Sequence, residues 1–360
     1  MSSKATGSDC TEQDDVQTRK VPEGKRSTSY GVVSMPFIQR LSHLALAIVL
    51  CAVASSVHAQ TYPTRPITLI CPLAAGSTTD ILARVLADGL SRALGQNVIV
   101  DDRPGAGGTI AMRQLAKAAP DGYTLAMGTN STLAINVGLY PDLGYDSVRD
   151  FAPILNIATS SNVLIVSTKS PVNSLKELIA YAREKGDRST YSSGGNGTTH
   201  HLSAALMAKM AGLNSVHVPY RGAPQGINAV VSDEVTFGFF NTPNVVSLVR
   251  DGAVKGLAVT SLQRSPLLPN LPTMSEAGLE GYETTVSFGL LAPAGTPTAI
   301  VARLHDAAAK VLADKELQAK LQAQGFDLLP IGSPEVYAAQ IKADIAKWVP
   351  IVKASGASTN

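Results

Sequence analysis

Short runs of apolar and β-branched residues alternate along this chain with longer segments in which apolar residues recur at helical spacing. The run ITLIC (67–71) predicts a strand, and TDILARVLADGLSRAL (79–94) predicts an amphipathic helix. NVIVDD (97–102) predicts a second strand, a helix is expected over 109–119, and YTLAMGT (123–129) returns to a strand. Such strand–helix alternation predicts a parallel sheet that is covered by helices on both faces.

The same alternation restarts in the second half of the chain. The expected strands cover 189–193, 215–220, 235–241 and 256–261. The expected helices run from the capping residue Ser174 to Lys185 and over 198–211, 223–231 and 243–250, with two more near 297–313 and 334–353. The pattern therefore predicts two separate α/β blocks.

Two segments are expected to join these blocks. The segment 147–167 is too long for one ordinary strand and carries polar residues midway, so we expect two strand segments with a crossover near Thr159 and Ser160. The apolar stretch 286–295 is the second candidate crossover, and it follows a proline-containing, loop-rich segment over 263–283. Two crossings form a hinge, so a cleft between two lobes is expected.

The first 59 residues depart from this pattern. Residues 1–34 are polar, and Arg40 then precedes an apolar run over 44–54 that has the length of the hydrophobic region of a signal peptide. A membrane-spanning helix would need about 20 apolar residues. The tripeptide VHA resembles a signal-peptidase site, so we expect a secretory signal cleaved after Ala59 and a periplasmic mature protein.

Three alternatives concern the same leader. Translation could start at Met35, since a long polar stretch ahead of a signal is unusual. Cys51 could be lipidated, although Leu50 is large for the position before a lipidated cysteine. The uncleaved apolar helix could also act as an anchor.

Composition narrows the function classes. The chain has 30 Lys and Arg against 28 Asp and Glu, a net charge of +2, so it has no electrostatic footprint for nucleic acid. Of its 3 cysteines, Cys10 and Cys51 lie in the leader. Cys71 is then alone in the mature chain, where no internal disulfide is possible, and we expect it to be a buried small hydrophobic residue.

Three glycine-rich turns lead from a predicted strand into a predicted helix, at 72–80, 103–111 and 192–201. Each should present backbone N–H groups at a helix N-terminus, which suits an anion. The first and third turns begin their respective blocks, so they could face each other across the cleft. For the second turn we favour a purely structural corner. No turn matches the dinucleotide or P-loop fingerprints.

Metal and catalytic signatures are weak. His200 and His201 are neighbours, and neighbouring helical residues point about 100° apart, so one ion rarely takes both. The sequence contains neither G-x-S-x-G nor H-E-x-x-H, and it offers no nucleophile beside a base at a recognisable spacing. Asp80 could be catalytic, but a helix cap or a tie to the opposite lobe is the favoured interpretation. We therefore expect no catalytic residue, metal or cofactor.

Two cations and one amide are candidates for the cleft. For Arg84, within a helix, a solvated charge or a structural ion pair is favoured. For Arg221, in a turn after a predicted strand, a solvated charge and a ligand contact remain equal alternatives. Asn241 could place an amide in the cleft or could cap the helix that follows it.

A set of landmarks in fixed order resembles a known family. They are YPTRPITLICPLAAGSTTDILAR, VIVDDRPGAGGTIA, AAPDGYTLAMGT, DFAPI, YSSGGNGTTHHL, VHVPYRG, LAVTSLQRSPLLPNLPTMSEAG and FGLLAPAGTP. Together they cover essentially all of residues 62–357 and resemble the solute receptors of tripartite tricarboxylate transporters, the Bug family. The resemblance implies a type II periplasmic binding protein, with two α/β lobes joined by two crossover strands and a ligand cleft between them.

The resemblance also implies an organisation and a function. Residues 1–59 would be an N-terminal extension and signal peptide, 60–159 with 286–360 the first lobe, and 160–285 the second lobe. Such receptors are monomers that close over a small organic carboxylate and deliver it to integral membrane transporter subunits. The alternatives are a carboxylate-sensing partner of a signalling system and, less favoured, an exported hydrolase.

In this family the two loops that open the lobes hold the ligand carboxylate, largely through backbone N–H groups and bridging waters. Carried over to this chain, with neighbouring cleft positions, this implies a ligand-binding set of Leu73, Gly76, Ser77, Thr78, Asp80, Ser160, Ser193, Asn196, Gly197, Thr198, His201, Tyr220 and Asn241. The chain departs from the family at Ser77 and Thr78, where glycine is usual, and at Phe240, where many members have Asp. These changes suggest a less polar, more aromatic cleft that favours an aromatic or longer-chain carboxylate.

Overall fold

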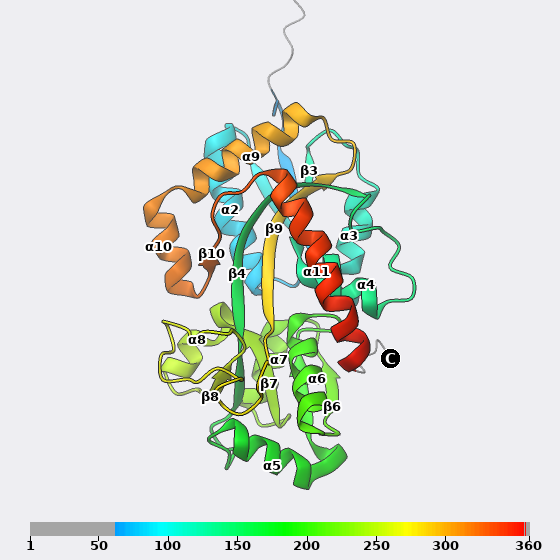
Figure 1. Ribbon diagram of the computed structural model, residues 1–360. Helices are drawn as coiled ribbons and strands as arrows, with labels where there is room; N and C mark the ends of the chain where they lie inside the picture. The colour runs from blue at the N-terminus through cyan, green and yellow to red at the C-terminus, as the bar shows by residue number, and fades with distance from the viewer. Residues whose placement is uncertain (1–61, 356, 358–360) are drawn as a thin grey trace, which may run out of the picture. The chain divides into compact units, whose positions relative to one another are not determined.

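The computed structural model describes residues 62–355 and 357 (Figure 1). The expected signal sequence, its cleavage after Ala59, and the alternatives at Met35 and Cys51 lie outside these residues. Within the described part of the chain, no helix is long and apolar enough to cross a membrane.

One mixed sheet forms the framework of the described residues, in the order β2-β1-β3-β9-β4-β7-β5-β6. Two further strands, β8 and β10, pair with β4 off this path. The strands are β1 (Ile67–Cys71), β2 (Val98–Asp102), β3 (Thr124–Thr129), β4 (Phe151–Ser167), β5 (Thr190–Ser193), β6 (Val216–Pro219), β7 (Phe237–Asn241), β8 (Val254–Val259), β9 (Thr285–Pro293) and β10 (Asp327–Leu328).

The expected parallel sheet is present only within each block. Strands β2, β1 and β3 pair in parallel, and so do β6, β5 and β7. The two joining strands are antiparallel to their neighbours, β9 to β3 and β4 to both β7 and β9. The expected parallel pairing is therefore confirmed within each block. The joining strands run antiparallel to their neighbours because a chain that leaves a block along one joining strand returns along the other.

The long segment before residue 167 is one continuous strand, and the expected break near Thr159 and Ser160 is wrong. Strand β4 spans 17 residues and absorbs its irregularity in register shifts against β9. Its midway polar residues, Ser160, Ser161 and Asn162, are buried but hydrogen-bonded, for example Ser161 Oγ to Thr242 Oγ1 at 3.0 Å. Buried polar groups with partners do not interrupt a strand. Figure 1 shows β4 and β9 side by side, linking the two lobes.

The helices follow the predicted pattern closely where apolar periodicity is strong. They are α2 (Thr78–Leu94), α3 (Thr109–Ala116), α4 (Asn136–Leu139), α5 (Leu175–Lys185), α6 (Thr199–Ala211), α7 (Ala223–Val231), α8 (Thr242–Arg250), α9 (Thr298–Leu312), α10 (Lys315–Gln324) and α11 (Pro334–Ser355). Two short 3₁₀ helices, η1 (Ala106–Gly108) and η3 (Gly186–Arg188), and a π-helix, η2 (Ser131–Ile135), complete the helical elements of the described residues. Ser174 caps α5 as expected, accepting from Glu177 N. Helix α10 was not predicted, because its sequence KELQAKLQAQ has few apolar positions.

Each lobe has apolar clusters on both faces of its part of the sheet. In the first lobe, Leu69 of β1 packs into the cluster with α2 and α9, whereas the next residue, Ile70, packs into the cluster with α3 and α11. In the second lobe, Leu164 of β4 faces α5 and α6, and Ile165 faces α7 and α8. The expected cover on both faces is therefore confirmed.

Candidate functional site

The first and third glycine-rich turns form the N-termini of α2 and α6. Ser77 caps α2 by accepting from Asp80 N, and Thr198 caps α6 by accepting from His201 N. Gly76 and Gly197, each one residue before the cap, have φ of +76° and +77°. Glycine adopts this left-handed conformation without the cost that a β-carbon would bring.

The two lobes touch through a pair of reciprocal hydrogen bonds at Asn244 of α8. Thr78 Oγ1 donates to Asn244 Oδ1 at 2.5 Å, and Asn244 Nδ2 donates to the carbonyl oxygen of Gly76 at 2.9 Å. One amide side chain of the second lobe thereby holds both a side chain and the backbone of the first lobe's glycine turn. The hydroxyl of Thr78 supplies one of the two bonds.

The second glycine-rich turn also lies at this junction. A β-carbon added at Gly107 would lie 2.3 Å from the carbonyl oxygen of Asn196, and one at Gly197 would lie 2.1 Å from Asn136 Oδ1. Asn136 Nδ2 in turn donates to the Gly107 carbonyl oxygen at 2.9 Å. This turn therefore also meets the opposite lobe, a contact that the interpretation of residues 103–108 as a structural corner did not include.

A cavity of about 330 Å³ opens between the lobes at these turns. Its walls come from all three glycine-rich turns, from α4 and from the turn after β6: Leu73, Ala74, Pro104, Gly105, Ala106, Gly107, Gly108, Tyr140, Gly194, Gly195, Asn196, Pro219, Tyr220 and Arg221. Its size is at the lower end of the range for small-molecule pockets. The walls are uncharged apart from Arg221, so the cavity carries one positive charge.

Several backbone N–H groups of the two turns are already hydrogen-bonded to nearby side chains. Gly76 N donates to Asp80 Oδ2 at 2.8 Å. In the third turn, Gly194 N donates to His200 Nδ1 and Gly197 N to His201 Nδ1, both at 3.3 Å, and Gly195 N donates to Ser193 Oγ at 3.0 Å. A ligand that used these donors would have to displace an acceptor from each of them.

A buried chain of amides extends from the third turn to the joining strand β4. His200 Nδ1 accepts from Gly194, so Nε2 carries the proton and donates to Asn241 Oδ1 at 3.0 Å. Asn241 Nδ2 donates to Asn162 Oδ1 at 2.7 Å, and Asn162 Nδ2 donates to Ser203 Oγ at 2.9 Å. Burial lowers the pKa of His200 to about 4, which keeps it neutral. Asn241 is the N-cap residue of α8 by position, but its side chain makes no capping hydrogen bond and belongs to this chain of amides instead.

His201 lies in a different environment from its neighbour. Its ring stacks on His217 with centroids 3.9 Å apart, and Tyr191 stacks on the same pair. Burial lowers the pKa of His201 to about 4, and burial with the nearby His201 lowers that of His217 to about 3. Both rings line a separate cavity of about 300 Å³ beside Lys209. The structure does not bring His201 to the interlobe cavity.

The remaining members of the expected set divide into three groups. Leu73, Asn196 and Tyr220 line the cavity. Ser193 and Thr198 shape the third turn from within, Ser193 through a 2.7 Å bond to His217 Nε2 and Thr198 through a 2.8 Å bond to the Gly195 carbonyl oxygen. In the third group, Ser160 donates to the carbonyl oxygen of Gly325 at 3.0 Å and belongs to the contact between β4 and the end of α10.

The departures at Ser77, Thr78 and Phe240 have structural explanations. The Ser77 hydroxyl caps α2 and the Thr78 hydroxyl contacts Asn244. Phe240 is fully buried beside His200 and does not line the cavity. The suggestion that Phe240 makes the cleft aromatic is therefore wrong, and the aromatic side chains of the cavity are those of Tyr140 and Tyr220.

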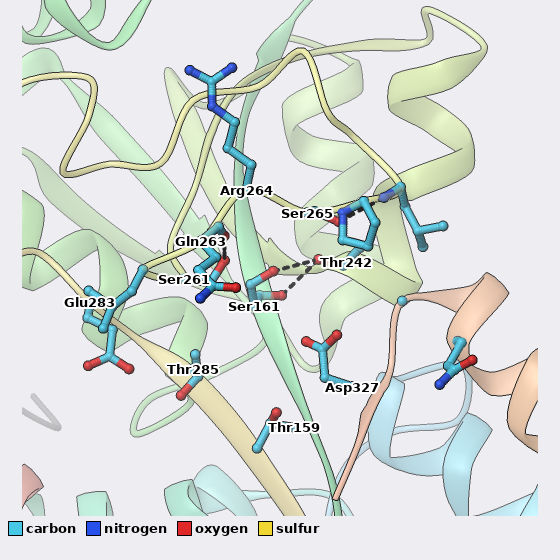
Figure 2. A pocket seen from close by; sticks show the side chains of 15 residues that line it. Thr159, Ser161, Thr242, Ser261, Gln263, Arg264, Ser265, Glu283, Thr285 and Asp327 are labelled. Carbon is cyan, nitrogen blue, oxygen red and sulfur yellow. Dashed lines mark hydrogen bonds between the residues drawn. The ribbon is translucent and has the colours of Figure 1, made fainter.

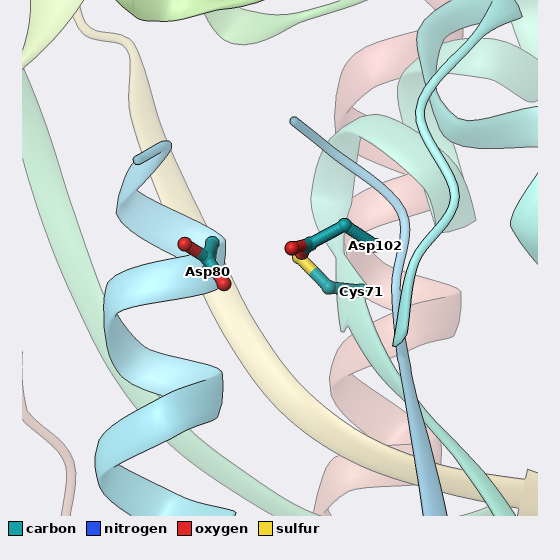
Figure 3. Close-up of side chains that lie close together, drawn as sticks. All are labelled: Cys71, Asp80 and Asp102. Atoms are coloured by element: carbon teal, nitrogen blue, oxygen red, sulfur yellow. The ribbon is translucent and has the colours of Figure 1, made fainter. Parts of the chain in front are cut away.

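Three side chains of the first lobe form the group closest to a metal-ligand set among the described residues: Cys71, Asp80 and Asp102 (Figure 3). Their ligand atoms lie within 4.8 Å of one another. Arg84 pairs with Asp80 Oδ1 and with Asp102 Oδ2, each at 2.7 Å, and burial raises the pKa of the Cys71 thiol. A protonated thiol and two carboxylates shared with a guanidinium suit a structural ion-pair network, as favoured for Arg84, better than a metal.

A second cavity of about 340 Å³ lies between the 261–267 loop, the joining strands and the end of α10 (Figure 2). Its charged residues are Arg264, Glu283 and Asp327. Arg264 pairs with Glu276 at 2.8 Å, and Figure 2 shows the Asp327 carboxylate directed toward Ser161 and Thr242. The two cavities have nearly the same volume, so charge distinguishes them. Glu283 is also paired, with Lys347 at 3.0 Å, so Asp327 is the charged lining residue without an ion-pair partner among the described residues, and its negative charge disfavours an anion here.

Sequence reasoning missed Gly107, Asn136, His200 and Asn244. Asn244 lies in the first turn of a helix, where asparagine is common because it can bond to the nearby backbone. Its position in the sequence therefore gives no indication of the contact with Gly76. His200 and His201 are indistinguishable by type. Only the orientation of α6 turns the first toward Asn241 and the second toward His217.

Comparison with known proteins gives consistent matches. The family model described as tripartite tricarboxylate transporter family receptor matches residues 82–357. The chain is 36% identical over 310 residues to a UPF0065 protein from the tcbD-tcbE intergenic region of Pseudomonas sp. strain P51, covering 85% of this chain and 91% of that protein. It is 32% identical over 324 residues to the protein BugT of Bordetella pertussis, covering 90% and 99%.

Solved structures agree. An R. palustris protein solved with adipate is 38% identical with a TM-score of 0.79, over 82% of this chain and 99% of that chain. The periplasmic binding protein BugD is 34% identical with a TM-score of 0.79, over 82% and 99%. MatC from Rhodopseudomonas palustris with bound malate is 31% identical with a TM-score of 0.78, over 81% and 100%.

Proposed function

The chain belongs to the tripartite tricarboxylate transporter receptor family, the Bug proteins, and from this we propose that it captures a small organic carboxylate between its lobes and delivers it to membrane transporter subunits. The family consists of periplasmic solute-binding receptors rather than enzymes. Two structural relatives were solved with adipate and with malate, which supports a carboxylate as the ligand class.

The observation that carries this proposal is the interlobe cavity with its single positive charge. All three glycine-rich turns and Arg221 line it. An anion there would contact both lobes, so its binding free energy would favour the closed arrangement. Exclusion of water on closure would strengthen each polar contact.

The boundaries between the lobes are proposed at residues 159/160 and 285/286. The first lies within β4 and the second at the start of β9, in a region where the two strands pair directly, for example Ser160 with Val286. We further propose that the working protein is a periplasmic monomer, released from its signal sequence after Ala59.

Thermal unfolding with a panel of carboxylates tests the proposal. A ligand at 100 times its Kd adds about 2.7 kcal/mol to the free energy of unfolding, which raises Tm by several degrees for a protein of this size. We expect a selective rise with one class of carboxylate and recovery of the ligand unchanged by NMR. Conversion of the ligand would indicate an enzyme, and no rise with any acid would refute carboxylate capture.

A further inference from the structure

Two backbone N–H groups that line the interlobe cavity are already hydrogen-bonded to side chains. The N–H groups of Gly194 and Gly195 already donate to His200 and Ser193. Nearby, those of Gly76 and Gly197 donate to Asp80 and His201. A carboxylate that bound these amides would leave buried acceptors, Asp80 above all, without their donors, and such unpaired groups are costly.

Arg221 has an exposed side chain and, unlike these groups, no partner among the described residues. Within the described residues its guanidinium makes neither a hydrogen bond nor an ion pair, and it is the only charged side chain that lines this cavity. A guanidinium can give a carboxylate two parallel hydrogen bonds. Tyr140 supplies a neutral donor on the first-lobe side, because burial raises the pKa of its hydroxyl and keeps it protonated.

The position of Arg221 in the chain fixes it at the junction of the lobes. It follows β6 and precedes Gly222, where an added β-carbon would lie 2.8 Å from the Cβ of Ala74 in the first lobe. The backbone beside Arg221 therefore packs against the first glycine turn. An anion held by Arg221 would be in reach of both lobes, whereas an arginine on an outer helix could not link binding to closure.

We propose that Arg221 is the charged anchor of the ligand carboxylate, and that the ligand is a carboxylate with an apolar body. This rests on the proposed function and adds a charged side chain to the backbone N–H groups that the family resemblance implies.

The walls of the cavity define the ligand class. Leu73, Ala74, Pro104 and Pro219 are apolar, and one cation can balance one carboxylate. A tricarboxylate would bring two further negative charges into a cavity of about 330 Å³ without a second cation. Desolvating an unpaired charge is strongly unfavourable, so a monocarboxylate such as hexanoate or benzoate fits better than citrate, and adipate, with one carboxylate beyond the first, lies between them.

The test compares charged and neutral ligands in matched variants. Calorimetric titration would measure Kd for hexanoate, benzoate, adipate and citrate, and for hexanamide and benzamide as neutral analogues, with the wild-type protein, R221Q, R221K and the control R188Q. Arg188 is an exposed arginine of η3 that lies outside the interlobe cavity. Equal Tm values of the variants without ligand would show that each is folded.

We expect R221Q to weaken binding of the preferred acid about tenfold or more, the contribution of a hydrogen bond to a charged group, and to leave binding of the neutral amide unchanged. R221K should lose less, R188Q should match the wild type, and the salt dependence of Kd should flatten in R221Q. Unchanged acid binding in R221Q, with tight binding to the wild type, would overturn the anchor while the proposed function stands. Tightest binding of citrate would overturn the ligand class, and no acid binding by the wild type would overturn the proposed function itself.

Discussion

Replacing Asn244 by alanine should weaken the closed arrangement of the lobes without unfolding either one. The substitution removes both hydrogen bonds that Asn244 makes across the junction, from Thr78 Oγ1 to Asn244 Oδ1 and from Asn244 Nδ2 to the Gly76 carbonyl oxygen. A net contribution of about 0.5–1.5 kcal/mol for each gives about 2 kcal/mol in total. Asn244 is only half-buried, so water can replace the lost partners in the open state.

This magnitude translates directly into populations. About 2 kcal/mol corresponds to a factor of about 30 between closed and open forms, since 1.4 kcal/mol is a factor of ten. If binding requires closure, the apparent Kd rises by the same factor when the closed form becomes the minor one. The increase should appear in the dissociation rate more than in the association rate, because ligand escapes through the opened lobes.

Small-angle scattering without ligand and calorimetry with the preferred carboxylate would measure the two effects. We expect Asn244→Ala to increase the radius of gyration and to raise Kd about tenfold to thirtyfold. Asn228→Ala, on the exposed side of α7, is the matched control and should change neither quantity. If Asn244→Ala left both the radius and Kd unchanged, the contact at Gly76 would play no part in closure and the reasoning would be refuted.

Three further predictions concern the same region. Gly107→Ala should prevent close approach of the lobes, since its β-carbon would overlap the opposing backbone at 2.3 Å and its φ is +62°; Kd for carboxylates should rise markedly, and unchanged affinity would contradict the role of this turn. Burial lowers the pKa values of three histidines in the folded protein below the ordinary value near 6.5, to about 4 for His200 and His201 and about 3 for His217. The unfolded chain therefore binds more protons than the folded protein, and the free energy of unfolding falls as the pH is lowered from about 6.5 towards 4. The free energy of unfolding, measured with urea, should be lower at pH 5.5 than at pH 7.5 by about 1.4 kcal/mol for each histidine. If this pH difference were as large in His217→Gln as in the wild type, the buried histidines would not be its cause. Cys71 is fully buried with a raised pKa, so it should resist thiol reagents in the native protein and react once unfolded, and rapid native labelling would show that the first turn opens.

Local sequence signals predicted the elements well where periodicity and caps agreed. Helix α2 has a serine cap, an apolar face and a left-handed glycine at its end, Gly95 with φ of +70°, and it lies within one residue of its expected bounds. Strand β4 was divided wrongly because Ser160 and Asn162 read as a break. Their hydrogen-bond partners, such as Ser203, come from distant parts of the chain, so no local pattern could show that these polar groups are satisfied.

The sequence by itself determined the two α/β blocks, the joining segments, the glycine turns at helix N-termini and the family, because these depend on local periodicity and on residues in fixed order. Only the tertiary structure decided which donors remain free. Whether Gly76 and Gly197 offer their N–H groups depends on where Asp80 and His201 point, and whether Arg221 is a solvated charge depends on what surrounds it. Where a side chain points and which group it pairs with depend on side chains that the fold brings together from separate elements. The spacing of residues along the chain does not determine these contacts.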